Sequence, residues 1–139
     1  MAAKHKQRIL VIDDDSLVSE SVSQVLLSAD YDVARAHNME VALMNFTKVD
    51  YDAVVLDVFM PGMGGIEGIV ELHALDADVP IIAISGGYMN MTPEAALDAA
   101  KKIGAVAVLI KPFPPDELLV ALSDVLGSDV LDSEGDGTA

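Results

Sequence analysis

The stretch Ile9-Leu10-Val11-Ile12-Asp13-Asp14-Asp15 joins four apolar residues directly to three aspartates. Three further apolar runs of similar character follow at residues 53–56, 81–84 and 105–110. Short, nearly uninterrupted runs rich in Ile and Val are typical of strands buried on both faces, as in a parallel sheet covered by helices. A fifth run, Tyr31 to Ala36, is more polar and fits an edge strand.

Segments with helical spacing separate these runs. Apolar residues recur every three or four positions between residues 17 and 29, and further helical segments are expected at residues 39–46, 65–75, 93–103 and 115–126. The order is therefore strand then helix, five times over. That order requires right-handed parallel crossovers and an open α/β sheet with helices on both faces.

The composition describes an acidic, cysteine-free chain of 139 residues with a net charge of −15. Its length predicts one domain, at residues 8–127, between a basic tail at 1–7 and an acidic, disordered tail at 128–139. The charge disfavours nucleic acid and anionic membranes, because affinity for phosphates rests on Lys and Arg. No stretch has the character of a membrane span or a signal peptide, so the sequence predicts a cytoplasmic protein.

Polar side chains follow the expected strands at the edge where ligands bind in open α/β sheets. They are Asp13, Asp14 and Asp15 after the first strand, Asp57 after the third, Ser85 after the fourth and Lys111 after the fifth. Converging carboxylates repel one another, so either their pKa values rise or a cation binds between them. Oxygen ligands without His or Cys favour Mg²⁺, which in proteins often accompanies a phosphoryl group. A carboxylate can accept that group, while a hydroxyl and an ammonium stabilise its oxygens.

The chain resembles the receiver domain of two-component response regulators, the CheY-like superfamily. Four motifs carry the resemblance, and they read Ile-Leu-Val-Ile-Asp13-Asp14-Asp15, Val-Val-Leu-Asp57-Val-Phe-Met-Pro61-Gly62-Met63-Gly64-Gly65, Ile-Ile-Ala-Ile-Ser85-Gly86 and Lys111-Pro112-Phe113. Together they cover about residues 8 to 127. The resemblance implies a flavodoxin-like, doubly wound (βα)5 fold whose five-stranded parallel sheet has the order 2-1-3-4-5.

The resemblance also implies roles for the acidic residues. Asp57 matches the residue that accepts a phosphoryl group from a sensor histidine kinase or a phosphotransfer protein. Asp14 matches the direct Mg²⁺ ligand, and Asp13 matches an acidic partner that acts largely through water. The backbone carbonyl of Phe59 is expected to be a further metal ligand.

Lys111 and Ser85 match the invariant cation and the switch hydroxyl of the family, and the bond between Lys111 and Pro112 is expected to be cis. The residues after Leu126 are too few for an effector domain, so none is expected. We therefore expect a stand-alone response regulator that signals by phosphorylation-dependent binding of a downstream protein or by passing its phosphoryl group onward. It would assist its own phosphorylation and dephosphorylation without being an enzyme in the ordinary sense.

Two departures from the family pattern leave alternatives open. Val108 stands where the family carries an aromatic switch residue, and the segment at residues 86–92 is longer than expected and could replace that moving part. A degenerate receiver that binds partners without phosphorylation is therefore one alternative. A phosphatase of the haloacid-dehalogenase type is the other, with Asp13 as nucleophile and Asp15 as acid, although Asp57 would then have no role.

Overall fold

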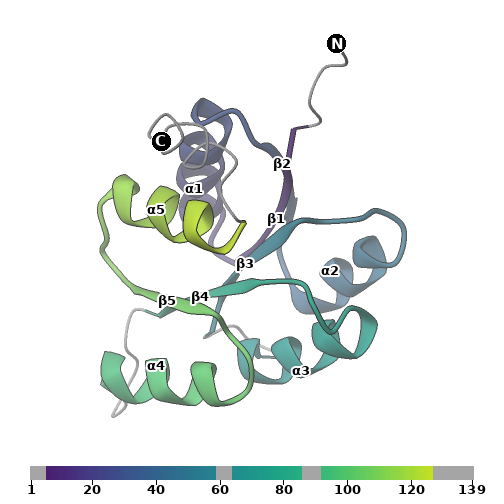
Figure 1. The fold of residues 1–139 in the computed structure, drawn as a ribbon, viewed down its shortest axis with the longest axis vertical. Coiled ribbons are helices and arrows are strands. Elements are labelled where there is room, and N and C mark those ends of the chain that lie inside the picture. The colour runs from purple at the N-terminus through teal and green to yellow at the C-terminus, as the bar shows by residue number, and fades with distance from the viewer. Residues whose placement is uncertain (1–5, 59–63, 86–91, 127–139) are drawn as a thin grey trace, which may run out of the picture.

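The computed structural model describes residues 6–58, 64–85 and 92–126 of the chain. Within these residues, five strands and five helices alternate, namely β1 (Arg8–Ile12), α1 (Ser16–Ser28), β2 (Asp32–Ala36), α2 (Met39–Phe46), β3 (Ala53–Asp57), α3 (Gly65–Leu75), β4 (Ile81–Ser85), α4 (Pro93–Lys102), β5 (Ala107–Ile110) and α5 (Pro115–Val125). The strands form one parallel sheet in the order β2-β1-β3-β4-β5, as Figure 1 shows. The expected doubly wound topology and strand order are confirmed.

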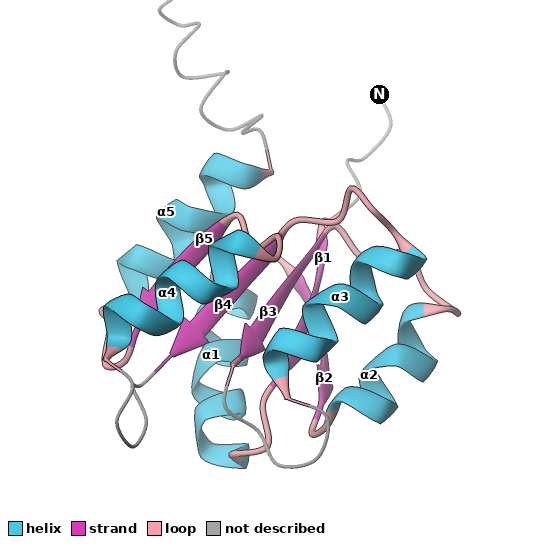
Figure 2. Cartoon of the chain, turned by 90° about the horizontal axis from the view of Figure 1, so that it is seen from below, coloured by secondary structure: helices cyan, strands magenta, loops and turns pink. Residues whose placement is uncertain are grey.

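Helices cover both faces of the sheet. α1 and α5 pack on one face, and α2, α3 and α4 lie on the other (Figure 2). Successive residues of β1 belong to different cores: Ile9 and Val11 pack with α1 and α5, whereas Leu10 and Ile12 pack with α2 and α3. This two-sided burial explains why the strand sequences are almost continuously apolar.

Local signals in the sequence set where several helices begin. The Asp15 carboxylate caps α1, accepting the backbone N–H of Leu17 at 2.9 Å and of Val18 at 3.3 Å. Thr92 caps α4 in the same way through the N–H of Ala95, at 3.1 Å. Short polar side chains accept hydrogen bonds from the first backbone N–H groups of a helix, so these residues define where α1 and α4 begin.

The fifth strand begins later than the sequence predicted. Residues 105–110 are all apolar, but β5 begins at Ala107. Gly104 has a φ of 125°, a conformation that suits glycine, and carries the chain out of α4 toward the sheet. The N–H of Val106 already donates to the carbonyl of Ile81 at 2.9 Å, so Ala105 and Val106 form the approach to the strand.

The expected tails, residues 1–7 and 128–139, lie almost wholly outside the described residues, and the domain limits stay a prediction. Among the described helices, none has the length and apolar character needed to cross a bilayer. The expected cytoplasmic location likewise stays a prediction.

Candidate functional site

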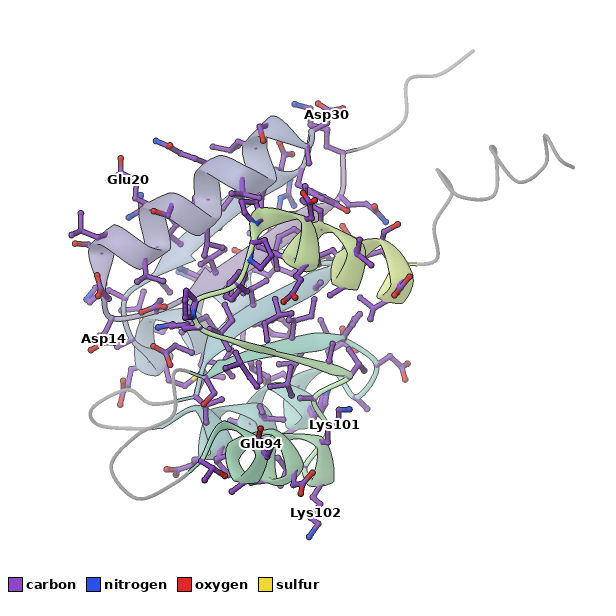
Figure 3. The ribbon with its side chains drawn as sticks, turned by 90° about the vertical axis from the view of Figure 1, so that its left-hand side faces the viewer. Asp14, Glu20, Asp30, Glu94, Lys101 and Lys102 are labelled. Carbon is purple, nitrogen blue, oxygen red and sulfur yellow. The ribbon has the colours of Figure 1, made fainter. Side chains whose placement is uncertain are left out.

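The parallel strands end side by side, and this edge gathers the polar residues. Ile12 lies in register with Ala36 on one side and with Leu56 on the other, so the residues after β1 and at the end of β3 are neighbours. Asp13 and Asp57 are buried there, with exposed fractions of 3% and 6%. Asp14 lies exposed at the loop edge beside the start of α1 (Figure 3).

Three carboxylates meet at this edge. One oxygen from each of Asp13, Asp14 and Asp57 lies within 4.8 Å of the others. Two oxygens on one Mg²⁺ are at most about 4.2 Å apart, because each Mg–O bond is about 2.1 Å long. The spacing of the three oxygens is close to that limit. An all-oxygen set of this spacing fits a hard divalent cation such as Mg²⁺.

The buried carboxylate of Asp13 is electrostatically strained. Burial is the main cause that raises its pKa, to about 6, and the negative charge of Asp57 adds to the rise. The N–H of Asp15 donates to Asp13 Oδ1 at 2.9 Å, and this hydrogen bond and the Lys111 ammonium lower the pKa in part. A cation bound at the cluster would favour the charged form of Asp13 and so oppose this rise.

Lys111 supplies the cation nearest to the acceptor position. Its Nζ lies 3.4 Å from Asp57 Oδ2 and 3.9 Å from Asp13 Oδ2. Its side chain is 29% exposed, so the lysine is partly sheltered as well as paired. The peptide bond between Lys111 and Pro112 is cis, as expected from the resemblance.

Ser85 is fully buried at the end of β4, between the strands that carry Asp57 and Lys111. Its carbonyl accepts the N–H of Lys111 at 2.9 Å, and the neighbouring carbonyl of Ile84 accepts the N–H of Val58 at 3.0 Å. The ends of β3, β4 and β5 are therefore held together by backbone hydrogen bonds up to the polar residues. Phe59 and residues 86–91 lie outside the described residues, so the predicted carbonyl ligand and the predicted moving segment stay untested.

Gly65 has a role at the site that sequence reasoning missed. It is the first residue of α3, and its N–H donates to the carbonyl of Val58 at 3.0 Å. A Cβ at this position would lie 2.5 Å from Val58 Cα and 2.8 Å from the carbonyl oxygen of Asp57. Only glycine allows the helix to approach the backbone beside Asp57 so closely. The run of glycines after Pro61 was the available signal.

The fold and its acidic edge define a doubly wound α/β domain of the CheY-like class. The chain belongs to the response regulator receiver domain family, whose model matches residues 9–123. The resemblance to the receiver domain of two-component response regulators, inferred from the sequence motifs, is thus confirmed.

Named relatives share this domain. The transcriptional regulatory protein PrrA of Mycobacterium leprae is 36% identical over 119 residues, which cover 86% of this chain and 49% of PrrA. The chemotaxis protein CheY of Thermotoga maritima is 32% identical over 120 residues, which cover 86% of this chain and 97% of CheY. The solved structure of the Vibrio cholerae chemotaxis protein CheY4 superposes with a TM-score of 0.78 at 30% identity, covering 87% of this chain and 99% of that one.

The chain thus spans about half the length of PrrA and nearly all of CheY. Since some relatives are transcriptional regulators, the expectation that this protein does not bind nucleic acid stays a prediction. The alternative of a haloacid-dehalogenase phosphatase loses its support, because the chain is a receiver domain and the Asp15 carboxylate that would serve as acid caps α1 instead.

Proposed function

We propose that this receiver domain accepts a phosphoryl group on Asp57 with the help of Mg²⁺, and that the phosphorylated form binds a partner protein or passes the group onward. The observation that carries the proposal is the convergence of Asp13, Asp14 and Asp57 within 4.8 Å, with Lys111 paired to two of them. The donor would be a sensor histidine kinase or a phosphotransfer protein, as for the family.

Asp13 and Asp14 would hold the metal together with Asp57, and the carbonyl of Phe59 is the fourth expected ligand. When bound, Mg²⁺ supplies positive charge that offsets the negative charge of the phosphoryl oxygens. The burial of Asp13 beside Asp57 supports this assignment, because a bound cation would offset the cost of keeping two neighbouring carboxylates charged away from water.

The transfer itself needs few protein groups. A carboxylate oxygen of Asp57 attacks the phosphorus of a phosphohistidine, the P–N bond breaks, and its electron pair stays on the imidazole of the donor. Lys111, 3.4 Å from Asp57 Oδ2, neutralises charge on the transferred group. Ser85, which follows the register partner of Asp57 on the neighbouring strand, would donate a hydrogen bond to a phosphoryl oxygen.

Incubation with MgCl₂ and acetyl phosphate, followed by intact-mass measurement, tests the proposal. We expect one added phosphoryl group that requires Mg²⁺ and that is lost in Asp57→Asn. Asp124→Asn, which changes an exposed aspartate on α5, is the matched control and should be phosphorylated like the wild type.

Absence of any adduct under all conditions would instead favour the degenerate receiver, for which the half-buried Val108 at the switch position is the supporting observation. An adduct that persists in Asp57→Asn would place the acceptor elsewhere and contradict the proposal.

A further inference from the structure

A small cavity lined mainly by polar residues adjoins the acid cluster. It has a volume of about 170 Å³ and is lined by Asp13, Ser16, Ser19, Arg35, Ala36 and His37. Asp13 belongs both to this cavity and to the acid cluster, so the two share a wall. The cavity lies where the edge strand β2 ends beside β1 and α1. Since a water molecule occupies about 30 Å³ in the liquid, the space suits a small polar group with a few waters.

Arg35 is held in a defined position on the wall of this cavity. Its Nε donates to the hydroxyl of Ser19 at 2.9 Å, and one terminal nitrogen donates to the carbonyl of Ser16 at 3.5 Å. Arg35 itself is exposed, but Ser19, to which it is anchored, is only 3% exposed. These two bonds use two of the five N–H donors of a guanidinium, which leaves donors for a ligand in the cavity.

The positive charge of Arg35 on the cavity wall is unusual in so acidic a chain. Only 8 of 139 residues are Lys or Arg, and the net charge is −15. Lys111 is already paired with Asp57 and Asp13, whereas the hydrogen bonds described for Arg35 go to uncharged oxygens. The cavity wall thus carries the Asp13 carboxylate on the side of the acid cluster and the Arg35 guanidinium with the His37 imidazole from the end of β2 and the residues after it, and an anion in the cavity would pair with Arg35.

We propose that Arg35 and His37 form an anion subsite for the carboxylate that leaves an acyl phosphate when Asp57 is phosphorylated. The inference rests on the proposed function. In the step, an oxygen of Asp57 bonds to phosphorus, the bond from phosphorus to the acyl oxygen breaks, and its electron pair departs on the carboxylate. The negative charge that develops on this leaving group is stabilised by the guanidinium of Arg35.

Two small phosphodonors distinguish stabilisation of the leaving carboxylate by Arg35 from a general attraction of Arg35 for the phosphoryl group. Acetyl phosphate releases acetate, an anion, whereas phosphoramidate releases ammonia once a proton is taken up. For Arg35→Gln we expect the rate constant of phosphorylation by acetyl phosphate to fall about tenfold and that by phosphoramidate to change less than about twofold. The unchanged rate with phosphoramidate also shows that the variant is folded and that its acceptor is intact.

Lys48→Gln is the matched control, since it removes an exposed positive charge from the loop between α2 and β3. It should leave both rates unchanged. An equal fall with both donors, no fall with acetyl phosphate, or the same fall in Lys48→Gln would overturn the anion subsite. Failure of the wild type to be phosphorylated by either donor would instead overturn the proposed function.

Discussion

At the scale of single residues, the buried Asp13 carboxylate lowers the stability of the folded domain at a position where the proposed chemistry needs a charged group. A carboxylate that is 3% exposed and faces a second carboxylate is costly to keep charged. Its folded-state pKa, raised to about 6, records that cost. A bound cation would remove most of this electrostatic cost. The folded state is therefore expected to be more stable with a cation at the acid cluster than without one.

The pH dependence of stability follows from this shift. Because the folded-state pKa of Asp13 lies above its ordinary value of 3.8, the folded state holds the proton more tightly, and stability from this group is lost as the pH rises through about 6. In the absence of metal, Asp13→Asn should therefore be more stable than the wild type by about 2 to 3 kcal/mol at neutral pH. The advantage should shrink toward zero near pH 4.

Urea unfolding of both proteins with EDTA, across that pH range, measures the difference. Asp124→Asn should show no such pH-dependent gain, since Asp124 is exposed on α5. A difference between Asp13→Asn and wild type that is constant with pH, or of opposite sign, would contradict the assignment.

At the scale of elements, the start of α1 links the acid cluster to the helix that follows it. Asp13, Asp14 and Asp15 are consecutive, yet the first is buried at the cluster, the second is exposed beside it and the third caps the helix. The cap fixes the path of the chain directly after the two aspartates proposed to hold the metal. One turn thus gives three identical side chains three different surroundings.

Removing the cap should destabilise the domain without removing its chemistry. Asp15→Ala loses the acceptor for the N–H groups of Leu17 and Val18, and we expect a loss of about 1 kcal/mol in the free energy of unfolding. Asp15→Asn keeps a capping oxygen, so it should retain nearly full stability. It should also be phosphorylated by acetyl phosphate at the wild-type rate, and loss of that reaction would show a chemical role for Asp15.

The elements were predictable from the sequence because their signals are local. Uninterrupted apolar runs marked strands such as Ile81–Ser85, and capping residues such as Thr92 marked helix starts. The polar residues at the strand ends were predictable for the same reason, since parallel strands end at one edge. The close approach at Gly65 and the anchoring of Arg35 to Ser19 depend on elements distant in sequence, and no local pattern specifies them.

At the scale of the whole molecule, repulsion among the excess negative charges opposes the compact folded state. A net charge of −15 on 139 residues creates repulsion that dissolved ions reduce. On α1 and at its end, Glu20 and Asp30 point outward, which spreads the negative charge over the surface (Figure 3). The acid cluster adds a local concentration of the same charge.

Salt should therefore stabilise the protein in two separable ways. NaCl should raise the midpoint of urea unfolding by screening, and MgCl₂ at the same ionic strength should raise it further by binding the folded state. In Asp14→Asn, which removes a proposed direct ligand, the increment specific to Mg²⁺ should shrink while the NaCl effect remains. Equal effects of the two salts on the wild type would argue against a metal site.

The hydrogen bonds across the strand ends bear on how such a domain diversifies. Val58 to Ile84, at 3.0 Å, and Lys111 to Ser85, at 2.9 Å, tie the backbone of three strands into one block beneath the reacting groups. Loops that leave this block can lengthen, shorten or change composition while the proposed acceptor Asp57 and Lys111 keep their spacing. The block therefore separates the surface that a partner would contact from the side chains proposed to carry the chemistry.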